Sequence, residues 1–368
     1  MMLILALLIF CIALCVLLAT QPLPFLPRTR CRLQTIKQQP THTETKLRQD
    51  VKPYQFPPLK EKTSTKMAMG LKRLDDSNWL TLDSAYLPEH TLRLQLLSSC
   101  QPDVVQMLPG SEPACHELLK TVTSFLSSRF PQHFTIASSP SGPEIVNRLT
   151  NEVYPIGPSC ANPLEVAAKL SMEDFNILVR SPETGEYHLQ ASATLFPAGW
   201  KLQERIGTSM ANLHRPVPGW NQKLGPCVNR YFDHLSHKTA MERTNVFIQT
   251  TPHLFQDAPE PTPSSPATVS QLMVRRERQT FTRLQQTGAV LFTVRTYMEP
   301  LTQLGDAELK ALRSQVLGWE AEVRAYKGGD IWGPPLLRLC EERCGAVVVE
   351  VAKADEKIMR ATVRGGGA

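Results

Sequence analysis

The stretch from Trp200 to Trp220, W-K-L-Q-E-R-I-G-T-S-M-A-N-L-H-R-P-V-P-G-W, begins as an amphipathic pattern and ends in prolines. Four apolar residues recur at helical spacing: Leu202, Ile206, Met210 and Leu213. The residue before a proline disfavours helical geometry, so the helix is predicted to end near His214 or Arg215, before Pro216. The sequence therefore predicts a helix whose last turn carries a histidine beside an apolar face.

The position of His214 leaves two interpretations open. A partly buried histidine at a helix C-terminus interacts favourably with the last carbonyl groups of the helix. Alternatively, a neutral imidazole at a rigid helix end, among leucine, methionine and isoleucine, suits the axial ligation of a haem iron. The spacing of the residues alone does not decide between a structural and a ligating histidine.

The composition indicates a folded chain without a disulfide framework. The 368 residues have a mass of 41.2 kDa, and 42% are hydrophobic while 20% are charged. This size suits one large domain or two modest ones. The nine cysteines are odd in number and scattered, so free thiols are expected.

Residues 1–20 are predicted to form a transmembrane anchor. They contain an uninterrupted apolar run, Met1 to Ala19, that approaches the length needed to span a bilayer. A cleaved signal peptide is the alternative, but no basic residue precedes the run. Arginines such as Arg28 and Arg30 follow it, so the positive-inside rule places the main domain in the cytosol. We therefore expect a single-pass membrane protein, with the endoplasmic reticulum as the expected membrane.

Residues 21–66 are predicted to be a disordered basic stalk. The segment is rich in proline, glutamine, threonine and lysine and shows little hydrophobic periodicity. It contributes much of the formal net charge of +6. A basic segment beside a membrane suits contact with anionic lipids or plain solubility. Aromatic residues that could stack on bases are few in this segment, namely Phe25, Tyr54 and Phe56, so we expect no nucleic-acid partner.

The remainder is predicted to begin with helices and to continue with strands. Predicted helices cover 116–130, 161–170, 227–235 and 307–326. Predicted strands cover 175–180, 187–196, 245–250, 289–297 and 345–351, the first two as a hairpin. Residues 257–268 are a proline-rich loop. This order favours an α+β fold with a mostly antiparallel sheet. Neither a nucleotide-binding glycine motif nor a G-x-S-x-G element is present in the sequence.

A second candidate site is polar and lies in two strand-like segments. It comprises Arg275, Arg276, Glu277, Arg278 and Gln279, followed by Arg295 and Tyr297. Strand alternation places Arg295 and Tyr297 on one face, where they could bind a carboxylate or polarise a small ligand. The alternative is that the R-R-E-R cluster is a solvated salt-bridge face. This alternative explains Arg295 less well, because its neighbours A-V-L-F-T-V are apolar.

Four blocks of sequence occur in a specific order. They are M-G-L-K-R-L with W-L-T-L-D-S-A-Y; M-E-D-F-N-I-L-V; L-F-P-A-G-W-K-L-Q-E-R-I-G-T-S-M-A-N-L-H-R-P-V-P-G; and R-R-E-R-Q-T-F-T-R-L with T-G-A-V-L-F-T-V-R-T-Y-M-E-P-L. Together they resemble the haem-dependent oxidative N-demethylase alpha-subunit-like family. The resemblance covers roughly Met67 to Leu304, within the usual boundary error of a few residues.

The resemblance implies a haem-binding, PAS-like fold, with a five-stranded antiparallel sheet and helices on one side. It also implies that haem b activates oxygen for the oxidative N-demethylation of a small amine. Electrons would come from NADPH through a separate flavin or iron–sulfur reductase, because this chain has no recognisable motif for either group. The alternative function is a non-catalytic, membrane-tethered haem sensor or carrier.

The resemblance also assigns residues. The family histidine in I-H-x-P-V-P corresponds to His214, which is the expected iron ligand. Arg295 and Tyr297 are expected at the catalytic site, where either could donate a hydrogen bond to oxygen. Glu277 and Arg278 are expected to contact the cofactor. The implied organisation is an anchor at 1–20, a stalk at 21–66, an N-demethylase-like domain at 67–325 and a C-terminal extension at 326–368.

Overall fold

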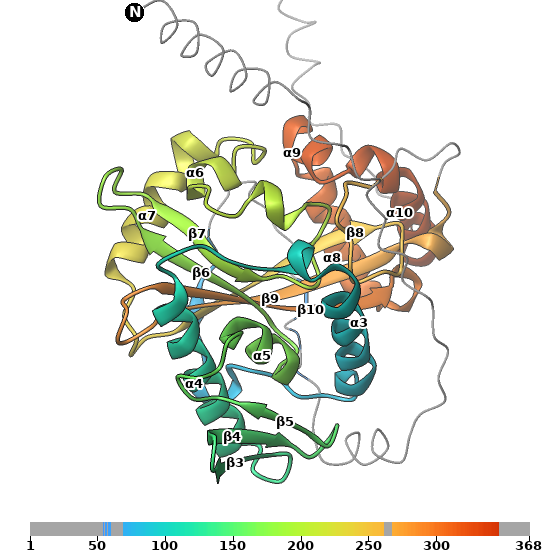
Figure 1. Cartoon of the computed structure of the whole chain (residues 1–368). Helices are drawn as coiled ribbons and strands as arrows, with labels where there is room; N and C mark the ends of the chain where they lie inside the picture. The colour runs from blue at the N-terminus through green and yellow to red at the C-terminus, as the bar shows by residue number, and fades with distance from the viewer. Residues whose placement is uncertain (1–53, 55, 57, 60–68, 261–266, 346–368) are drawn as a thin grey trace, which may run out of the picture. The chain divides into compact units, whose positions relative to one another are not determined.

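The computed structural model describes residues 54, 56, 58, 59, 69–260 and 267–345 (Figure 1). The predicted anchor at 1–20, most of the predicted stalk at 21–66 and the predicted strand after residue 345 lie outside these residues. Among the helices that the structure describes, none is both long enough and apolar enough to cross a bilayer.

One antiparallel sheet organises the described part of the chain. Its spatial order is β1-β8-β9-β10-β6-β7-β2, and each neighbouring pair is antiparallel. The long strands are β6 (Asp174–Arg180), β7 (Tyr187–Ala193), β8 (Met241–Gln249), β9 (Met273–Arg283) and β10 (Val290–Pro300). Short strands β1 (Lys72–Arg73) and β2 (Val105–Met107) extend the two edges. The predicted α+β class and the β6–β7 hairpin are confirmed, and the sheet has seven strands where five were expected.

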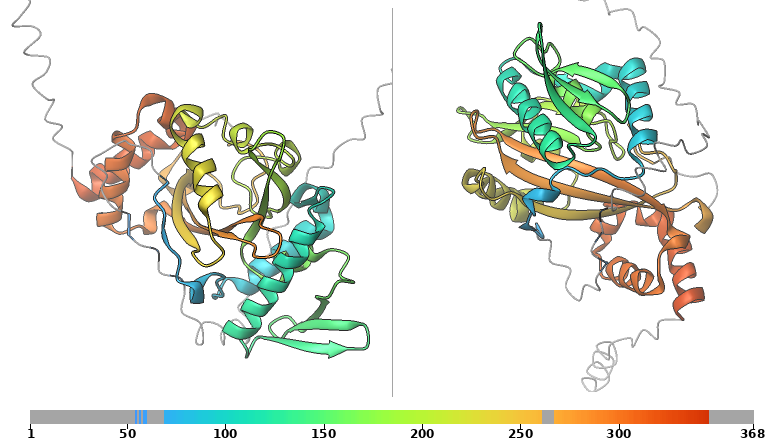
Figure 2. Two further views of the ribbon diagram at one scale, coloured as in Figure 1. Left: turned by 90° about the vertical axis from the view of Figure 1, so that its left-hand side faces the viewer. Right: turned by 90° about the horizontal axis from the view of Figure 1, so that it is seen from below.

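Helices cover both faces of this sheet, whereas the resemblance implied helices on one side. One face carries α3 (Tyr86–Val104), α4 (Glu112–Arg129) and α5 (Pro163–Leu170); the other carries α6 (Met210–Leu213) and α7 (Gly225–His234) (Figures 1 and 2). The reason lies in the strands themselves. Val290 and Leu291 are consecutive, so they point to opposite faces, yet both are fully buried. Apolar residues on both faces require cover on both.

Three further helices complete the core at one end of the sheet. They are α8 (Asp306–Leu317), α9 (Ala321–Tyr326) and α10 (Gly329–Cys344). Leu309, Leu312 and Leu336 from this group pack with Ile248 of β8 and Val274 of β9 in one buried cluster. The single helix predicted at 307–326 is therefore two helices. The remaining short elements are 3-10 turns, η1 (Asp76–Asn78), η2 (Leu202–Glu204), η4 (Val269–Gln271) and η5 (Leu301–Gln303), and a π-helical turn, η3 (Trp220–Leu224).

A second, three-stranded sheet follows α4 and was missed by the sequence analysis. It has the order β3 (Phe134–Ser139), β4 (Gly142–Asn147) and β5 (Glu152–Pro155). Its sequence contains serine, glycine and proline and has little alternation of apolar and polar residues. Only Phe134, Ile145 and Asn147 among its side chains are deeply buried, so the pattern that marks a strand is weak.

The predicted helix at 200–214 is wrong in its middle and right at its end. Helical turns occur only at η2 and at α6. Between them Gly207 has a φ of +76°, which favours glycine. The Gly207 N–H donates to the Leu189 carbonyl, and the Leu189 N–H donates to the Thr208 carbonyl. Pairing with β7 thus replaces the helix, while His214 is the C-cap of α6, as the prolines predicted.

The turn between β9 and β10 is held to α4 by one carboxylate. Glu117 accepts hydrogen bonds from the Gln286 N–H (2.6 Å), the Thr287 N–H (2.9 Å) and the Thr287 hydroxyl (2.7 Å). Glu117 is itself buried, and replacing it with alanine removes three hydrogen bonds to a charged group, so we expect a loss of about 2–3 kcal/mol in the free energy of unfolding. Urea denaturation measures it. Glu112→Ala, at the exposed start of the same helix, is the control and should cost much less.

Candidate functional site

A cavity of about 1210 Å³ lies against the sheet face that α6 and α7 cover. Its floor is formed by side chains of four strands, namely Asn176, Leu178, Arg243, Asn245, Glu277, Gln279, Phe281, Phe292 and Val294. Its other walls come from residues 200–232 and from the segment that contains α8, α9 and α10, including Trp319, Val323, Tyr326 and Trp332. The volume exceeds the roughly 300–1,000 Å³ of ordinary ligand pockets, so the cavity can hold a large cofactor together with a small ligand.

His214 lines this cavity, and it is the only histidine among the described residues to do so. Its Nδ1 lies 3.0 Å from the Met210 carbonyl oxygen. A carbonyl oxygen can only accept, so Nδ1 carries the hydrogen and Nε2 has the free lone pair. A histidine that ligates a metal through one ring nitrogen usually donates from the other in this way. The chain also carries His188, His234 and His237, each of which could have served as a sixth ligand of an iron bound to His214, but none of them lines the cavity.

The surroundings of His214 keep its ring neutral and oriented. Burial lowers the pKa of His214 from 6.5 to about 4, although the hydrogen bond to Met210 opposes this, and the charges of Arg205 and Arg243 lower the pKa further. The imidazole stacks on the indole of Trp220 with ring centroids 3.8 Å apart and planes 8° apart. The stack covers a face of the ring, while a metal would bind in the plane of the ring at Nε2.

The lowered pKa of His214 predicts a pH dependence of the haem-free protein. The unfolded chain binds a proton at this histidine near pH 6.5, but the folded chain does so only near pH 4. The stability that the chain gains from keeping His214 neutral is therefore fully present above pH 6.5. As the pH falls toward 4, the free energy of unfolding decreases by about 2–3 kcal/mol. Urea unfolding at pH 7.5 and 4.5 measures it. His214→Phe, which can still stack on Trp220, should lose distinctly less stability over this interval; an equal loss would refute the assignment.

Two arginines that the sequence analysis missed lie in the same cavity as His214. Arg205 donates to the Leu213 carbonyl (3.3 Å) and its guanidinium lies 4.6 Å from the ring centre of Trp200. Arg243 lies on β8, and its buried Nε has no hydrogen-bond acceptor within the described ranges. Burial lowers the pKa of both groups. In sequence each looks like an ordinary surface arginine, and only the fold brings them to His214.

Glu277, which was expected to contact the cofactor, lines the same cavity as His214. Its carboxylate accepts from Arg275 Nε (3.2 Å) and from Gln279 Nε2 (3.0 Å). The interpretation of R-R-E-R as a solvated face is wrong, because Arg275, Arg276, Glu277 and Arg278 are all buried. Arg275 and Glu277 share one face of β9, and Arg276 and Arg278 share the other. Because both faces are covered, neither pair of side chains is exposed to solvent.

Arg278, Arg295 and Tyr297 do not line the cavity that contains His214. They lie on the opposite face of the sheet, as the alternation of β9 and β10 requires. The guanidinium of Arg295 lies 4.3 Å from the ring centre of Tyr297, which confirms that these two share a face. Arg278 pairs with Glu242 at 2.7 Å. None of the three residues is therefore placed to contact a cofactor that His214 would hold in this cavity.

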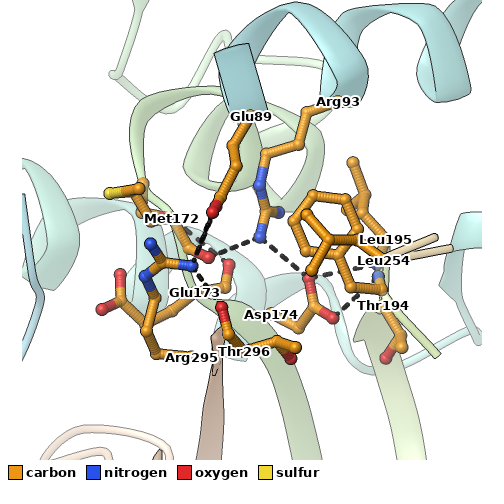
Figure 3. A network of polar contacts seen from close by, with 12 residues as sticks. Glu89, Arg93, Met172, Glu173, Asp174, Thr194, Leu195, Leu254, Arg295 and Thr296 are labelled. Carbon is orange, nitrogen blue, oxygen red and sulfur yellow. Dashed lines mark hydrogen bonds and ion pairs between the residues drawn. The ribbon is translucent and has the colours of Figure 1, made fainter. Parts of the chain in front are cut away.

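Arg295 has its own buried partners on that face. It donates to both oxygens of Glu89, at 3.0 and 2.8 Å (Figure 3). It also donates to Asp83 at 3.2 Å. Beside it, Arg93 pairs with Asp174 at 3.1 Å and donates to the Met172 carbonyl. These contacts join α3 to the sheet, so the arrangement is that of a structural network.

Comparison with known families agrees with the resemblance in the sequence. A family model described as haem-dependent oxidative N-demethylase, alpha subunit-like, matches residues 70–337. The match contains the cavity floor, His214 and both missed arginines. It also extends past the boundary expected at 325 and ends inside α10, whose residues share a buried cluster with β8 and β9.

Proposed function

The chain belongs to the haem-dependent oxidative N-demethylase, alpha subunit-like family, and from this premise we propose that it binds haem b through His214 and oxidatively demethylates a small amine. The observation that carries the proposal is the state of His214: it lines a large cavity, is neutral at pH 7, and has its Nε2 lone pair free because Nδ1 donates to Met210.

The cavity suits haem b in polarity as well as in size. Haem b is a flat, largely apolar ring with two carboxylates on one edge. Apolar side chains line the cavity together with His214, among them Met210, Leu213, Val217, Phe281 and Phe292. Arg205 and Arg243 are cations in the same cavity, and a guanidinium group can pair with a carboxylate through two parallel hydrogen bonds. We assign His214 to the iron and these two arginines to the carboxylates.

Haem, when bound, supplies the activation of oxygen. The residues of the chain orient and shield the reactants. His214 is fixed by Met210 and Trp220, and the apolar walls exclude water. Glu277 places a carboxylate on the cavity floor, suited to an ammonium group, and its neighbours on β9, Arg275 and Gln279, hold its orientation. Overall, one N-methyl group, one oxygen molecule, two electrons and two protons give the demethylated amine, formaldehyde and water.

We propose that the two electrons come from a separate NADPH-dependent reductase. The sequence has no recognisable flavin or iron–sulfur motif, and the reaction cannot balance without a reductant. We also propose that residues 1–20 anchor the chain in a membrane of the endoplasmic reticulum type, with the main domain in the cytosol. Membrane fractionation of the full chain beside a chain without residues 1–20 tests this; equal release of both into the soluble fraction would refute it.

The test of the proposed function uses the full chain. Haem is titrated into it and the absorption spectrum is followed, after which a chemical reductant, oxygen and a panel of small N-methylated amines are supplied. We expect one haem per chain with a Soret band, and formaldehyde from at least one amine. A chain that stays colourless would refute haem binding. A haem-loaded chain that releases no formaldehyde would favour the alternative, a haem sensor or carrier.

A further inference from the structure

Asn176 is a buried amide on the cavity floor whose two ends have different surroundings. It lies on β6, its side chain is 7% exposed, and it contributes to the lining of the cavity. Its Oδ1 accepts from the hydroxyl of Ser192 (2.8 Å) and from that of Thr194 (3.3 Å). The two hydroxyls also lie 2.8 Å from each other. One end of the amide is thus fully engaged within the sheet.

The hydroxyls determine which way round the amide lies. With Oδ1 toward them, the hydrogens of Ser192 and Thr194 both have an acceptor. If the amide were turned over, its NH₂ would donate to both hydroxyl oxygens, and one hydroxyl hydrogen would have no acceptor among the contacts of this cluster. Ser192 is fully buried and Thr194 is 4% exposed, so water cannot replace that acceptor cheaply. The amide nitrogen therefore lies on the other side.

The Nδ2 group of Asn176 consequently presents hydrogen-bond donors to the cavity. No acceptor for it occurs among the described residues, and it is not one of the fully enclosed unpaired atoms, so it retains accessible surface. Because Asn176 is otherwise buried and lines the cavity, that surface faces the cavity. A buried donor without a protein partner is costly, and it marks a place where a ligand can accept.

Asn176 and His214 belong to opposite walls of the cavity. His214 comes from the α6 segment above the sheet and Asn176 from the sheet itself (Figure 1). Leu178, two residues along β6, and Met210, one turn before His214, belong to the same buried cluster, so continuous apolar packing joins the two walls. If His214 held a haem in this cavity, a small ligand on the sheet side of the haem would lie toward the wall that carries Asn176. Resting on the proposed function, we propose that Asn176 donates a hydrogen bond to such a ligand.

The test uses carbon monoxide on the reduced protein and fluoride on the oxidised protein, both with the haem-loaded full chain. Asn176→Asp keeps an oxygen for the hydroxyls of Ser192 and Thr194 but removes the N–H donors; Asn176→Leu removes the whole group. We expect the C–O stretch to move to higher wavenumber in both variants, because a donor beside the ligand weakens the C–O bond. Fluoride, which needs a donor, should bind roughly tenfold more weakly.

Thr293→Val is the matched control. Thr293 is fully buried in the same sheet, and it lies with its hydrogen-bond partner Thr280 on the face away from the cavity. The Thr293→Val variant should therefore leave the C–O stretch and the fluoride affinity unchanged. If the parent binds haem but neither Asn176 variant moves the C–O stretch beyond this control, the role of Asn176 is refuted while the proposed function stands. If Asn176→Leu does not fold, Asn176→Asp decides. If the parent shows no Soret band, both proposals are refuted.

Discussion

His214→Gly is expected to lower the affinity of the chain for haem by about two orders of magnitude or more. Losing even an outer partner of a metal ligand typically costs about 10–100-fold, and here the ligand itself is removed. Among the described histidines none other lines the cavity, so no neighbour can replace His214. The Soret band on haem titration measures the effect, and the exposed His234→Gly is the control, which should bind haem as the parent does.

Rescue by imidazole separates a lost ligand from a damaged fold. His214→Gly leaves a space beside the indole of Trp220, where the missing ring stacked. Free imidazole should enter this space, ligate the iron and restore the Soret band in a saturable manner. Arg205→Met and Arg243→Met should weaken haem binding without such rescue, because they remove cations and not the iron ligand. Haem binding by His214→Gly equal to that of the parent would contradict the assignment of His214.

The local sequence predicted features that depend on near neighbours. Pro216 and Pro218 end the helical turn, so the place of His214 at a C-cap was visible in the sequence. The alternation in residues 289–297 likewise predicted a strand and the shared face of Arg295 and Tyr297. The local sequence could not show which face of the strand borders the cavity. Both faces of the strand are buried, so no exposed polar face distinguishes one side from the other.

Features that depend on distant partners were missed for a physical reason. The helix predicted at 200–214 is interrupted because Gly207 pairs with Leu189 of β7. The local sequence pattern contains no information about this distant partner. Asn176 acquires its role only when β7 brings Ser192 and Thr194 beside it. The apolar run F-N-I-L-V at 175–179 contains one asparagine, and this is the single local signal: a buried polar residue that needs a partner.

Replacing Arg295 with methionine is expected to lower the free energy of unfolding by about 3–5 kcal/mol, which is the usual cost of breaking a buried ion pair from one side. Arg295 is 1% exposed and bonds to Glu89 and Asp83. Its loss leaves two buried carboxylates without their cation. Since a whole domain is stabilised by only about 5–15 kcal/mol, this variant should be near the limit of folding. Urea denaturation beside the exposed Arg338→Met, expected within about 0.5 kcal/mol of the parent, measures it.

The pH dependence of Arg295→Met distinguishes an unpaired charge from a simple loss of packing. Burial already raises the pKa of Glu89 to about 7, although the positive charges of Arg295 and Arg93 oppose this. Without Arg295 the pKa of Glu89 rises further, so the folded variant holds a proton that the unfolded chain releases above pH 4.5, and its stability falls as the pH rises. The gap between variant and parent should therefore be smaller at pH 5 than at pH 8. Adding Glu89→Leu should recover part of the loss at pH 8, because a paired apolar replacement removes the uncompensated charge. A gap that is constant with pH, with no recovery in the double variant, would show that packing and not charge is what Arg295 contributes.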